Sequence, residues 1–277
     1  MLAMAMGAPE IVSVGADYIA QLQGASMKNP KSILITGASS GIGEALARHY
    51  AAPGIVLHLC GRNRERLESV TDACRALGAD VHAMVLDVTD AARCRAWIDA
   101  SDVIAPLDLA IANAGVGLPQ FGESMDRVAR ETFAVNVDGV FNTAHPAIDR
   151  MRPRGRGQIA IVSSLAGYQG LASTPAYSSS KAAVKAYGEA LRGFLEPEGI
   201  EVSVICPGFV ESRITARNDF SMPFFMEAPR AARIIAKGLA RNRGRITFPW
   251  QMVIAGRILI NLPMGVIDWL ARRAPRK

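Results

Sequence analysis

The 277-residue sequence predicts an α/β fold in which helices cover both faces of a parallel β-sheet. Short apolar, β-branched runs alternate with segments of helical period, an order typical of parallel strands joined by crossover helices. The runs are apolar at successive positions, so both faces of each strand should be buried. Half of the residues are hydrophobic and a fifth are charged, a globular composition that excludes a disordered or collagen-like chain.

Six apolar runs are the expected strands, and five segments between them are the expected helices. The strands are placed at residues 32–36, 55–60, 81–86, 107–112, 158–163 and 201–206. The helices are placed at residues 44–51, 64–77, 91–100, 125–151 and 176–196. A short strand at 246–248 precedes an apolar tail at 249–277. Because no internal repeat, low-complexity linker or composition break is evident, residues 27–277 are expected to form one domain.

The N-terminal segment and the cysteines favour an unexported protein. Residues 1–26 are expected to be a loosely ordered arm or the result of an early start site, because Met27 stands just ahead of the first strand. They lack the basic start and the continuous apolar stretch of a signal peptide. The four cysteines show no Cys-x-x-Cys spacing, which is typical of reduced thiols in the cytoplasm. The four histidines show no ligand spacing either, so no metal site is expected.

The charge and the tail raise two further possibilities. The formal net charge of +6 is concentrated late in the chain without interleaved aromatic residues, so nucleic-acid binding is not expected. The tail has Trp250 and Trp269 near its ends, so contact with a membrane surface is one interpretation. Packing on the substrate pocket or on a partner subunit is the favoured one. Arg257 and Pro263 interrupt the tail too early for a spanning helix.

The first strand leads into a glycine-rich turn, TGASSGIG at Thr36–Gly43, and then into a helix. In this order, backbone N–H groups and the helix dipole can face a pyrophosphate, as in a Rossmann-type doubly wound sheet. The spacing differs from G-x-G-x-x-G, and a purely structural turn is the alternative. The residues expected to contact a dinucleotide here are Gly37, Ser39, Ser40, Gly41, Ile42 and Gly43.

The end of the second strand indicates which dinucleotide is bound. Many NAD-binding domains place a carboxylate there for the ribose 2′-hydroxyl, but this chain has Cys60-Gly61-Arg62-Asn63. The planar guanidinium of Arg62 suits a 2′-phosphate, which makes NADP(H) the predicted cofactor. An arginine on a solvated loop is the alternative.

The third and fourth strands end in further candidate cofactor contacts. Asp87 can accept a hydrogen bond from the adenine amino group, and Val88 can supply a backbone donor. A cap on the following helix is the alternative for Asp87. Asn113, Ala114 and Gly115 permit close approach to the adenosine ribose. For Asn113 a structural role is equally compatible with the sequence.

Two residues of the last long helix are the candidate proton-transfer pair. Tyr177 and Lys181 are four residues apart, so their side chains project from one face of that helix. Ser164 follows the fifth strand, where a loop at the carboxyl end of the sheet can bring it beside the phenol.

Several ordered motifs together give the chain a specific resemblance. Over Lys31 to Phe248 it resembles the short-chain dehydrogenase/reductase superfamily, in its single-domain branch. The matching motifs are TGASSGIG, Asn113-Ala114-Gly115, Asn136, Ser163-Ser164, Tyr177-Ser178-Ser179-Ser180-Lys181 and Pro207-Gly208.

The resemblance implies a catalytic set. Tyr177 would be the general acid or base, and Lys181 with an oxidised nicotinamide would lower the pKa of the phenol. Lys181 would also hold the nicotinamide ribose. Ser164 would hydrogen-bond the substrate oxygen, and Asn136 would hold a water that relays protons to Lys181. Ser163 is the other candidate serine, placed at the strand end.

The resemblance also assigns the segment after the sixth strand to the nicotinamide carboxamide. The residues concerned are Pro207, Gly208, Val210 and Ser212, the last at a position where the family often has Thr. Residues 211–229 would be a mobile lid over the substrate. The lid is apolar, with Phe220, Met222, Phe224, Phe225 and Met226, and it predicts a hydrophobic substrate. Core or oligomer packing of these side chains is an equal alternative.

The sequence therefore predicts a cytoplasmic NADP(H)-dependent oxidoreductase of a small carbonyl compound or secondary alcohol, assembled as a homodimer or homotetramer. The alternative is a protein that senses NADP(H) without turnover. An intact set of Asn136, Ser164, Tyr177 and Lys181 favours the enzyme, because a sensor has no chemical need for all four.

Overall fold

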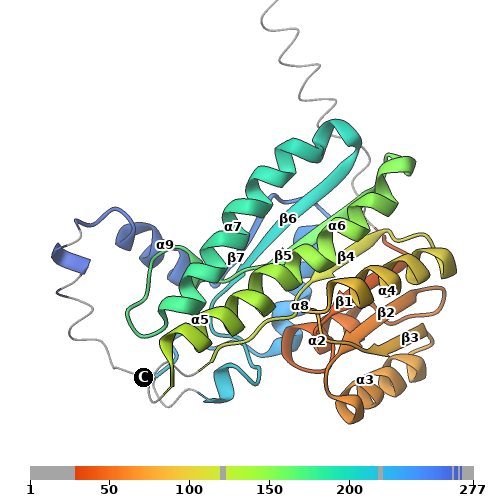
Figure 1. The fold of residues 1–277 in the computed structure, drawn as a ribbon, viewed down its shortest axis with the longest axis horizontal. Helices are drawn as coiled ribbons and strands as arrows, with labels where there is room; N and C mark the ends of the chain where they lie inside the picture. The colour runs from red at the N-terminus through yellow and green to blue at the C-terminus, as the bar shows by residue number, and fades with distance from the viewer. Residues whose placement is uncertain (1–28, 119–122, 218–220, 264, 268, 270–277) are drawn as a thin grey trace, which may run out of the picture.

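Seven parallel strands form one sheet, in the order β3-β2-β1-β4-β5-β6-β7 (Figure 1). The computed structural model describes residues 29–118, 123–217, 221–263, 265–267 and 269. The predicted doubly wound parallel fold is confirmed. The strands are β1 (Ser32–Thr36), β2 (Val56–Gly61), β3 (Asp80–Val85), β4 (Leu109–Ala112), β5 (Gly157–Val162), β6 (Ile200–Pro207) and β7 (Arg245–Phe248).

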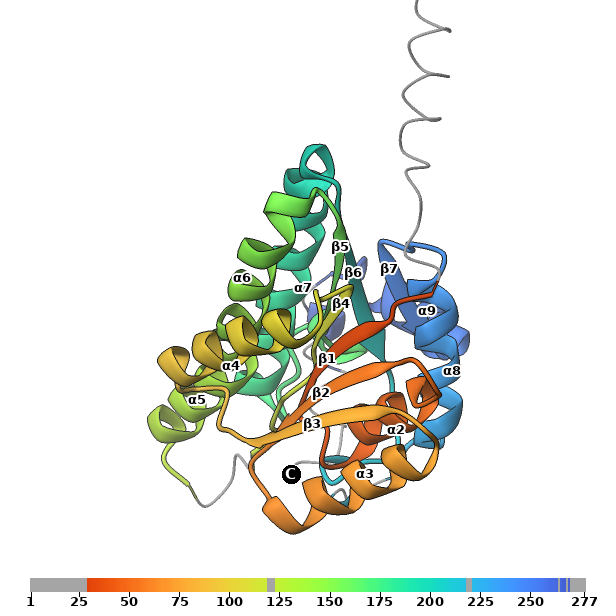
Figure 2. The same ribbon diagram turned by 90° about the vertical axis from the view of Figure 1, so that its right-hand side faces the viewer.

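Helices cover both faces of this sheet. Figure 2 shows α2, α3 and α8 on one face and α4, α5, α6 and α7 on the other. The helices are α2 (Gly41–Tyr50), α3 (Arg64–Ala76), α4 (Ala91–Ile104), α5 (Met125–Phe133), α6 (Gly139–Met151), α7 (Pro175–Leu195), α8 (Ala228–Leu239) and α9 (Trp250–Leu259).

The two helical layers bury two separate apolar cores. Successive residues of a strand point to opposite faces, so Ile33 and Ile35 of β1 enter one core and Leu34 enters the other. All three are fully buried. The continuous apolar runs of the sequence thus follow from burial on both faces, as predicted.

The predicted helix at 125–151 is divided into two helices. A π-helical turn, Ala134–Asp138, separates α5 from α6. Such turns insert one residue into a helix and often lie at functional sites. Asn136 is at the centre of this turn and is fully buried.

Helix α8 is not among the predicted helices, although its sequence carries the period. Its buried residues include Ala228, Ala231, Ala232, Ile235 and Leu239, an i, i+3, i+4, i+7 spacing that packs on the sheet. The small alanine side chains make the apolar stripe narrow, and the basic residues between them weaken the apolar pattern further.

The apolar tail begins with helix α9. Trp250, Ile254 and Ile258 on this helix are 67%, 50% and 59% exposed, whereas Ile267 is buried. None of the described helices is both long and apolar enough to cross a membrane. The predicted arm at 1–26 and the end of the tail at 270–277 lie outside the described residues.

Candidate active site

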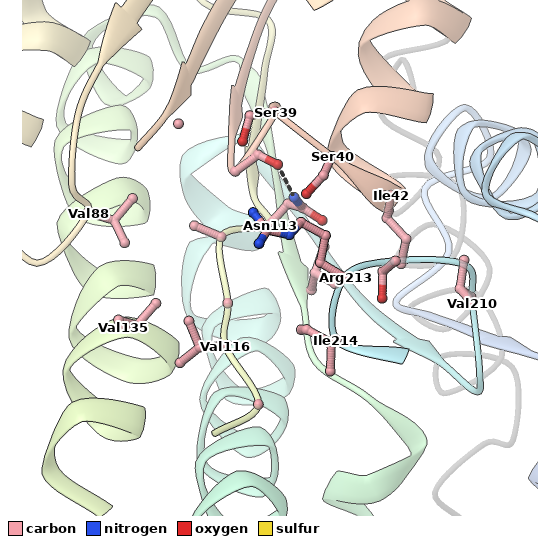
Figure 3. A pocket seen from close by; sticks show the side chains of 18 of the residues that line it. Ser39, Ser40, Ile42, Val88, Asn113, Val116, Val135, Val210, Arg213 and Ile214 are labelled. Atoms are coloured by element: carbon pink, nitrogen blue, oxygen red, sulfur yellow. Dashed lines mark hydrogen bonds between the residues drawn. The ribbon is translucent and has the colours of Figure 1, made fainter. Parts of the chain in front are cut away.

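A cleft of about 390 Å³ opens at the carboxyl ends of the strands, beside the point between β1 and β4 where the sheet reverses its winding (Figure 3). All but two of the predicted site residues line this cleft. The exceptions, Gly43 and Asn136, are buried outside the lining. The predicted residues that line the cleft are Gly37, Ser39, Ser40, Gly41, Ile42, Arg62, Asp87, Val88, Asn113, Ala114, Gly115, Ser164, Tyr177, Lys181, Pro207, Gly208, Val210 and Ser212.

The glycine turn between β1 and α2 depends on the absence of side chains. Gly37 and Gly41 have φ values of +66° and +57°, which favour glycine. A Cβ at Gly37 would lie 2.8 Å from the Cα of Ala114. A Cβ at Gly43 would collide with the carbonyl oxygen of Gly37. Gly43 therefore permits the close approach of helix and turn, which is a packing role, and the cofactor contact predicted for it stays a prediction.

Helix α2 begins without a side-chain cap at its N-terminus. The N-cap side chains of α3, α4 and α5 each accept a hydrogen bond from the first turn, whereas that of Ser40 makes no such bond. Ser40 thus offers no side-chain acceptor to the first N–H groups of α2, and Gly41 and Ile42 of this first turn line the cleft. Such groups, with the helix dipole, suit a phosphate. The turn thus fits the diphosphate of a dinucleotide.

Arg62 and Asp87 lie together at the end of the cleft formed by β2 and β3. A guanidinium nitrogen of Arg62 is 3.6 Å from the Asp87 carboxylate. The pKa of Asp87 is lowered: burial alone would raise it, but hydrogen bonds from Thr89 and the charge of Arg62 together outweigh burial. The alternative that Asp87 caps the next helix is wrong, because Asp90 accepts the hydrogen bond from the first turn of α4.

Asn113 ties the loop after β4 to the glycine turn. Its side-chain Nδ2 donates to the carbonyl oxygens of Thr36, at 2.9 Å, and Gly37, at 3.3 Å. Its backbone N–H donates to the Thr36 hydroxyl at 3.1 Å. The side chain thus has the structural role that the sequence left open, while Ala114 and Gly115 bring backbone to the cleft wall.

Tyr177, Ser164 and Lys181 come together on one wall of the cleft. The Tyr177 phenol forms a hydrogen bond with Ser164, whose hydroxyl also lies 3.4 Å from the carbonyl oxygen of Pro207. Lys181 Nζ is 5.9 Å from the centre of the Tyr177 ring and donates to the Val162 carbonyl at 2.9 Å. Ser163 instead donates to the backbone oxygen of Lys181 at 2.7 Å, which leaves Ser164 as the serine that meets the phenol.

Burial sets the protonation of both members of the pair. It raises the pKa of Tyr177, and the hydrogen bond with Ser164 lowers that pKa by a smaller amount. It lowers the pKa of Lys181 to about 8. The predicted lowering of the phenol pKa is therefore not found in the protein alone, because desolvation of the phenolate dominates.

The side chain of Asn136 holds the backbone beside the cleft. Its Oδ1 accepts from the Val116 N–H at 2.8 Å, and its Nδ2 donates to the Val116 carbonyl and the Ser180 hydroxyl, each at 3.0 Å. Both of its N–H donors are thus used within the protein. Gly115 lies between this amide and Lys181: a Cβ on it would be 3.2 Å from Asn136 Oδ1 and 3.3 Å from Lys181 Nζ. The amide is a positioning group, and its predicted role with a relay water stays a proposal.

Asn136→Ala is expected to destabilise the fold by about 2 to 4 kcal/mol, because it leaves both polar groups of Val116 without their buried partner. Urea unfolding measures this loss. Asn142→Ala is the matched control: it removes one hydrogen bond to the Val88 carbonyl on the same helical layer and should cost about 1 kcal/mol. Equal losses in the two variants would contradict the positioning role.

The segment after β6 folds back over the glycine turn. Val210 forms a bridge with Met226, and a Cβ at Gly41 would lie 3.0 Å from the Cβ of Ser212. The Ser212 hydroxyl accepts from the Thr215 N–H at 3.2 Å. Ser212 therefore closes a local turn at the edge of the cleft.

The residues of the predicted lid that line the cleft are not the described Phe and Met residues of its apolar pattern. Met226 is buried in the core, as the packing alternative holds, whereas Phe224 and Phe225 are about half exposed and do not line the cleft. Phe220 lies outside the described residues. The residues of this segment that line the cleft besides Ser212 are Arg213, Ile214 and Thr215. Figure 3 labels Arg213 and Ile214.

Arg66 and Val116–Leu118 also line the cleft, and the sequence patterns did not predict them. Arg66 is four residues after Arg62, and this spacing was the available signal. The loop 116–118 extends the Asn113-Ala114-Gly115 motif, but its apolar residues carry no chemical signal. Elsewhere, the described residues contain no group of three or more His, Cys, Asp or Glu placed to hold a metal ion.

Comparison with known proteins identifies the family. The family model described as short chain dehydrogenase matches residues 31–221. This chain belongs to the short-chain dehydrogenase family. An oxidoreductase from Myxococcus xanthus, of uncharacterised activity, is 40% identical over 246 residues, which cover 88% of this chain and 97% of that protein.

Two solved short-chain dehydrogenases share the fold and differ in cofactor. The one from Burkholderia phymatum, in complex with NAD, has a TM-score of 0.77 and 26% identity, and covers 91% of this chain and 98% of its own. The one from Sphingobium yanoikuyae, in complex with NADPH, has a TM-score of 0.72 and 25% identity, and covers 84% and 96%. The short-chain dehydrogenase described here is thus an oxidoreductase by family, and the fold alone does not select NAD or NADP.

Proposed function

We propose that this short-chain dehydrogenase transfers hydride between NADP(H) and a hydrophobic ketone, aldehyde or secondary alcohol. The observation that carries the proposal is that Tyr177, Ser164 and Lys181 meet on one wall of a cleft that begins at the glycine turn. The Ser164 hydroxyl interacts with the phenol, and Lys181 Nζ lies 5.9 Å from the centre of its ring. The cleft runs from the glycine turn past Tyr177, so one extended ligand can reach both.

In this proposal Tyr177 donates the proton in reduction and accepts it in oxidation. When bound, a nicotinamide supplies or takes the hydride. Ser164 holds the substrate oxygen against the phenol, since the other contacts of its hydroxyl are the Pro207 carbonyl, at 3.4 Å, and the N–H of Ala166. Lys181 presents a buried ammonium beside the ring, where it stabilises the phenolate as it forms.

Arg62 supports NADP(H) over NAD(H) in the proposed reaction. The position after β2 carries a cation where NAD-binding domains often carry a carboxylate. Its side chain is 60% exposed, and its ion pair with Asp87 is long, at 3.6 Å. The guanidinium is therefore able to turn toward a 2′-phosphate.

Arg62→Asp is expected to weaken NADPH binding by about 10- to 100-fold and to leave NADH binding within about 3-fold, because only NADPH carries the phosphate. Dissociation constants from the quenching of protein fluorescence measure both. Arg64→Asp is the control, since Arg64 is 72% exposed, pairs with Glu68 and does not line the cleft. Equal weakening of both cofactors by Arg62→Asp would refute the 2′-phosphate role.

The experiment that tests the proposed function is an absorbance assay with NADPH and a panel of hydrophobic ketones and aldehydes, and with NADP⁺ and the matching alcohols. We expect turnover with at least one pair. Binding of NADPH without turnover across the panel would favour the sensing alternative. We propose a cytoplasmic homodimer or homotetramer for the reaction; the exposure of Met125 and Phe194, at 76% and 68%, supports contact between subunits.

A further inference from the structure

Arg66 lines the cleft, and its Nε has no acceptor among the described residues. It is the third residue of helix α3, where its backbone N–H donates to the side chain of Asn63 at 2.9 Å. Its side chain is half-buried and lines the same end of the cleft as Arg62. The Nε of this guanidinium is buried and has no hydrogen-bond partner within the described residues.

A buried donor without an acceptor is rare in folded proteins and calls for a physical explanation. Neighbouring arginines do have partners: Arg64 pairs with Glu68 at 3.6 Å, and Arg75 donates to the Val81 carbonyl at 2.9 Å. The side chain of Arg66 makes no ion pair with any described residue, although Glu65 is adjacent in sequence. An acceptor that enters the cleft from solvent would satisfy its Nε.

The charge balance at this end of the cleft points to the nature of that acceptor. The charged lining residues that come from the ends of β2 and β3 and from α3 are Arg62, Arg66 and Asp87. The other two charged lining residues, Lys181 and Arg213, come from α7 and from the segment after β6. Arg62 and Asp87 form a pair whose charges cancel. Without Arg66, a phosphate would meet a subsite of no net charge, with the Asp87 carboxylate in it. Arg66 supplies the uncompensated positive charge that a phosphate dianion requires.

We propose that Arg66 is a second ligand of the cofactor 2′-phosphate, beside Arg62, and adds to the preference for NADP(H). The inference rests on the proposed NADP(H) function. A guanidinium presents a fork of N–H donors that matches phosphate oxygens, and Nε is part of that fork. NAD(H) has a 2′-hydroxyl and no anion at this position, so Arg66 would favour NADP(H) through the charge of its 2′-phosphate.

The test uses the full chain and two fragments that contain no nicotinamide, 2′,5′-ADP and 5′-AMP. Isothermal titration gives their dissociation constants with the wild type, Arg66→Gln and Arg66→Lys. For 2′,5′-ADP, we expect Arg66→Gln to lose about 10- to 100-fold and Arg66→Lys, which keeps the charge and loses the fork, about 3- to 10-fold. For 5′-AMP, each variant should stay within about 2-fold of the wild type.

Arg64→Gln is the matched control, two residues away on the same helix but exposed and outside the cleft. It should bind both fragments as the wild type does. If the wild type prefers 2′,5′-ADP and Arg66→Gln keeps the full preference, the role of Arg66 is overturned and the NADP preference stands. A wild type that binds the two fragments equally would overturn the NADP preference, and Arg66 with it. The circular dichroism melting curve of each variant verifies folding.

Discussion

Tyr177→Phe is expected to reduce turnover by at least about 10³-fold, because it removes the phenol that moves the substrate proton. Phenylalanine fills the same volume at the start of α7, so the cleft keeps its shape. The substitution deletes the hydroxyl that bonds Ser164, and the stability loss should be about 1 kcal/mol. Affinity for NADPH should stay within about 3-fold of the wild type.

Tyr187→Phe is the matched control for this experiment. Tyr187 lies on the same helix, but its hydroxyl bonds His145 at 2.6 Å on the outer surface, and it does not line the cleft. Turnover of the control should equal that of the wild type. If Tyr177→Phe turns over substrate at the wild-type rate, the proton passes through another group and the proposed mechanism is wrong.

The fold was predictable from the sequence because burial on both faces leaves a simple pattern. Three successive apolar residues, Ile33, Leu34 and Ile35, are buried together only in a strand covered by helices on both sides. The first and last residues of the strands lie within two positions of the prediction, and those of β1 agree with it. The differences arise because hydrogen bonding and not hydrophobicity sets strand ends. Helix α8 was missed because alanines at helical spacing give a weak apolar signal.

Site residues were predictable where a residue type implies a chemistry. They were less predictable where the path of the backbone determines their contacts. Tyr177, Ser164 and Lys181 were placed together because the carboxyl ends of parallel strands and the start of a helix share one edge of the sheet. The π-helical turn around Asn136 depends on tertiary packing, so the pattern of residues 125–151 gave no sign that its amide would bind Val116. That Arg66 Nε is buried and has no hydrogen-bond partner among the described residues is likewise evident only from the structure.

Two acidic residues near α4 illustrate the same limit. Asp87 and Asp90 both precede the helix, and an aspartate at either position is a good N-cap. Only the structure shows that Asp90 accepts from the N–H of Arg93 at 3.0 Å, which frees Asp87 to bond Thr89 and pair with Arg62. Asp87 therefore contributes a carboxylate to the cleft because the cap of α4 lies three residues later, at Asp90.

Lys181→Met is expected to lower turnover by about 10²- to 10³-fold, because it removes the cation beside the Tyr177 phenol. The same variant should also change how stability depends on pH. Burial lowers the pKa of Lys181 from its ordinary 10.5 to about 8, so between these values the unfolded chain binds more protons than the folded protein. The free energy of unfolding of the wild type therefore contains a penalty that is complete below about pH 8 and disappears as the pH rises toward 10.5.

The methionine introduced by this substitution has no proton to bind in either state, so the variant lacks this dependence. The free energy of unfolding of the wild type, minus that of Lys181→Met, should increase by about 2 kcal/mol from about pH 7 to about pH 9.5. The subtraction removes the titration of the tyrosines and cysteines, which both proteins share. Urea unfolding at several pH values measures the difference. Val184→Ala, a neutral change in the core beside the same helix, should give a difference that is constant with pH. Parallel curves for the wild type and Lys181→Met would show that the buried ammonium is not destabilised by its surroundings, and would remove the physical basis for its role beside Tyr177.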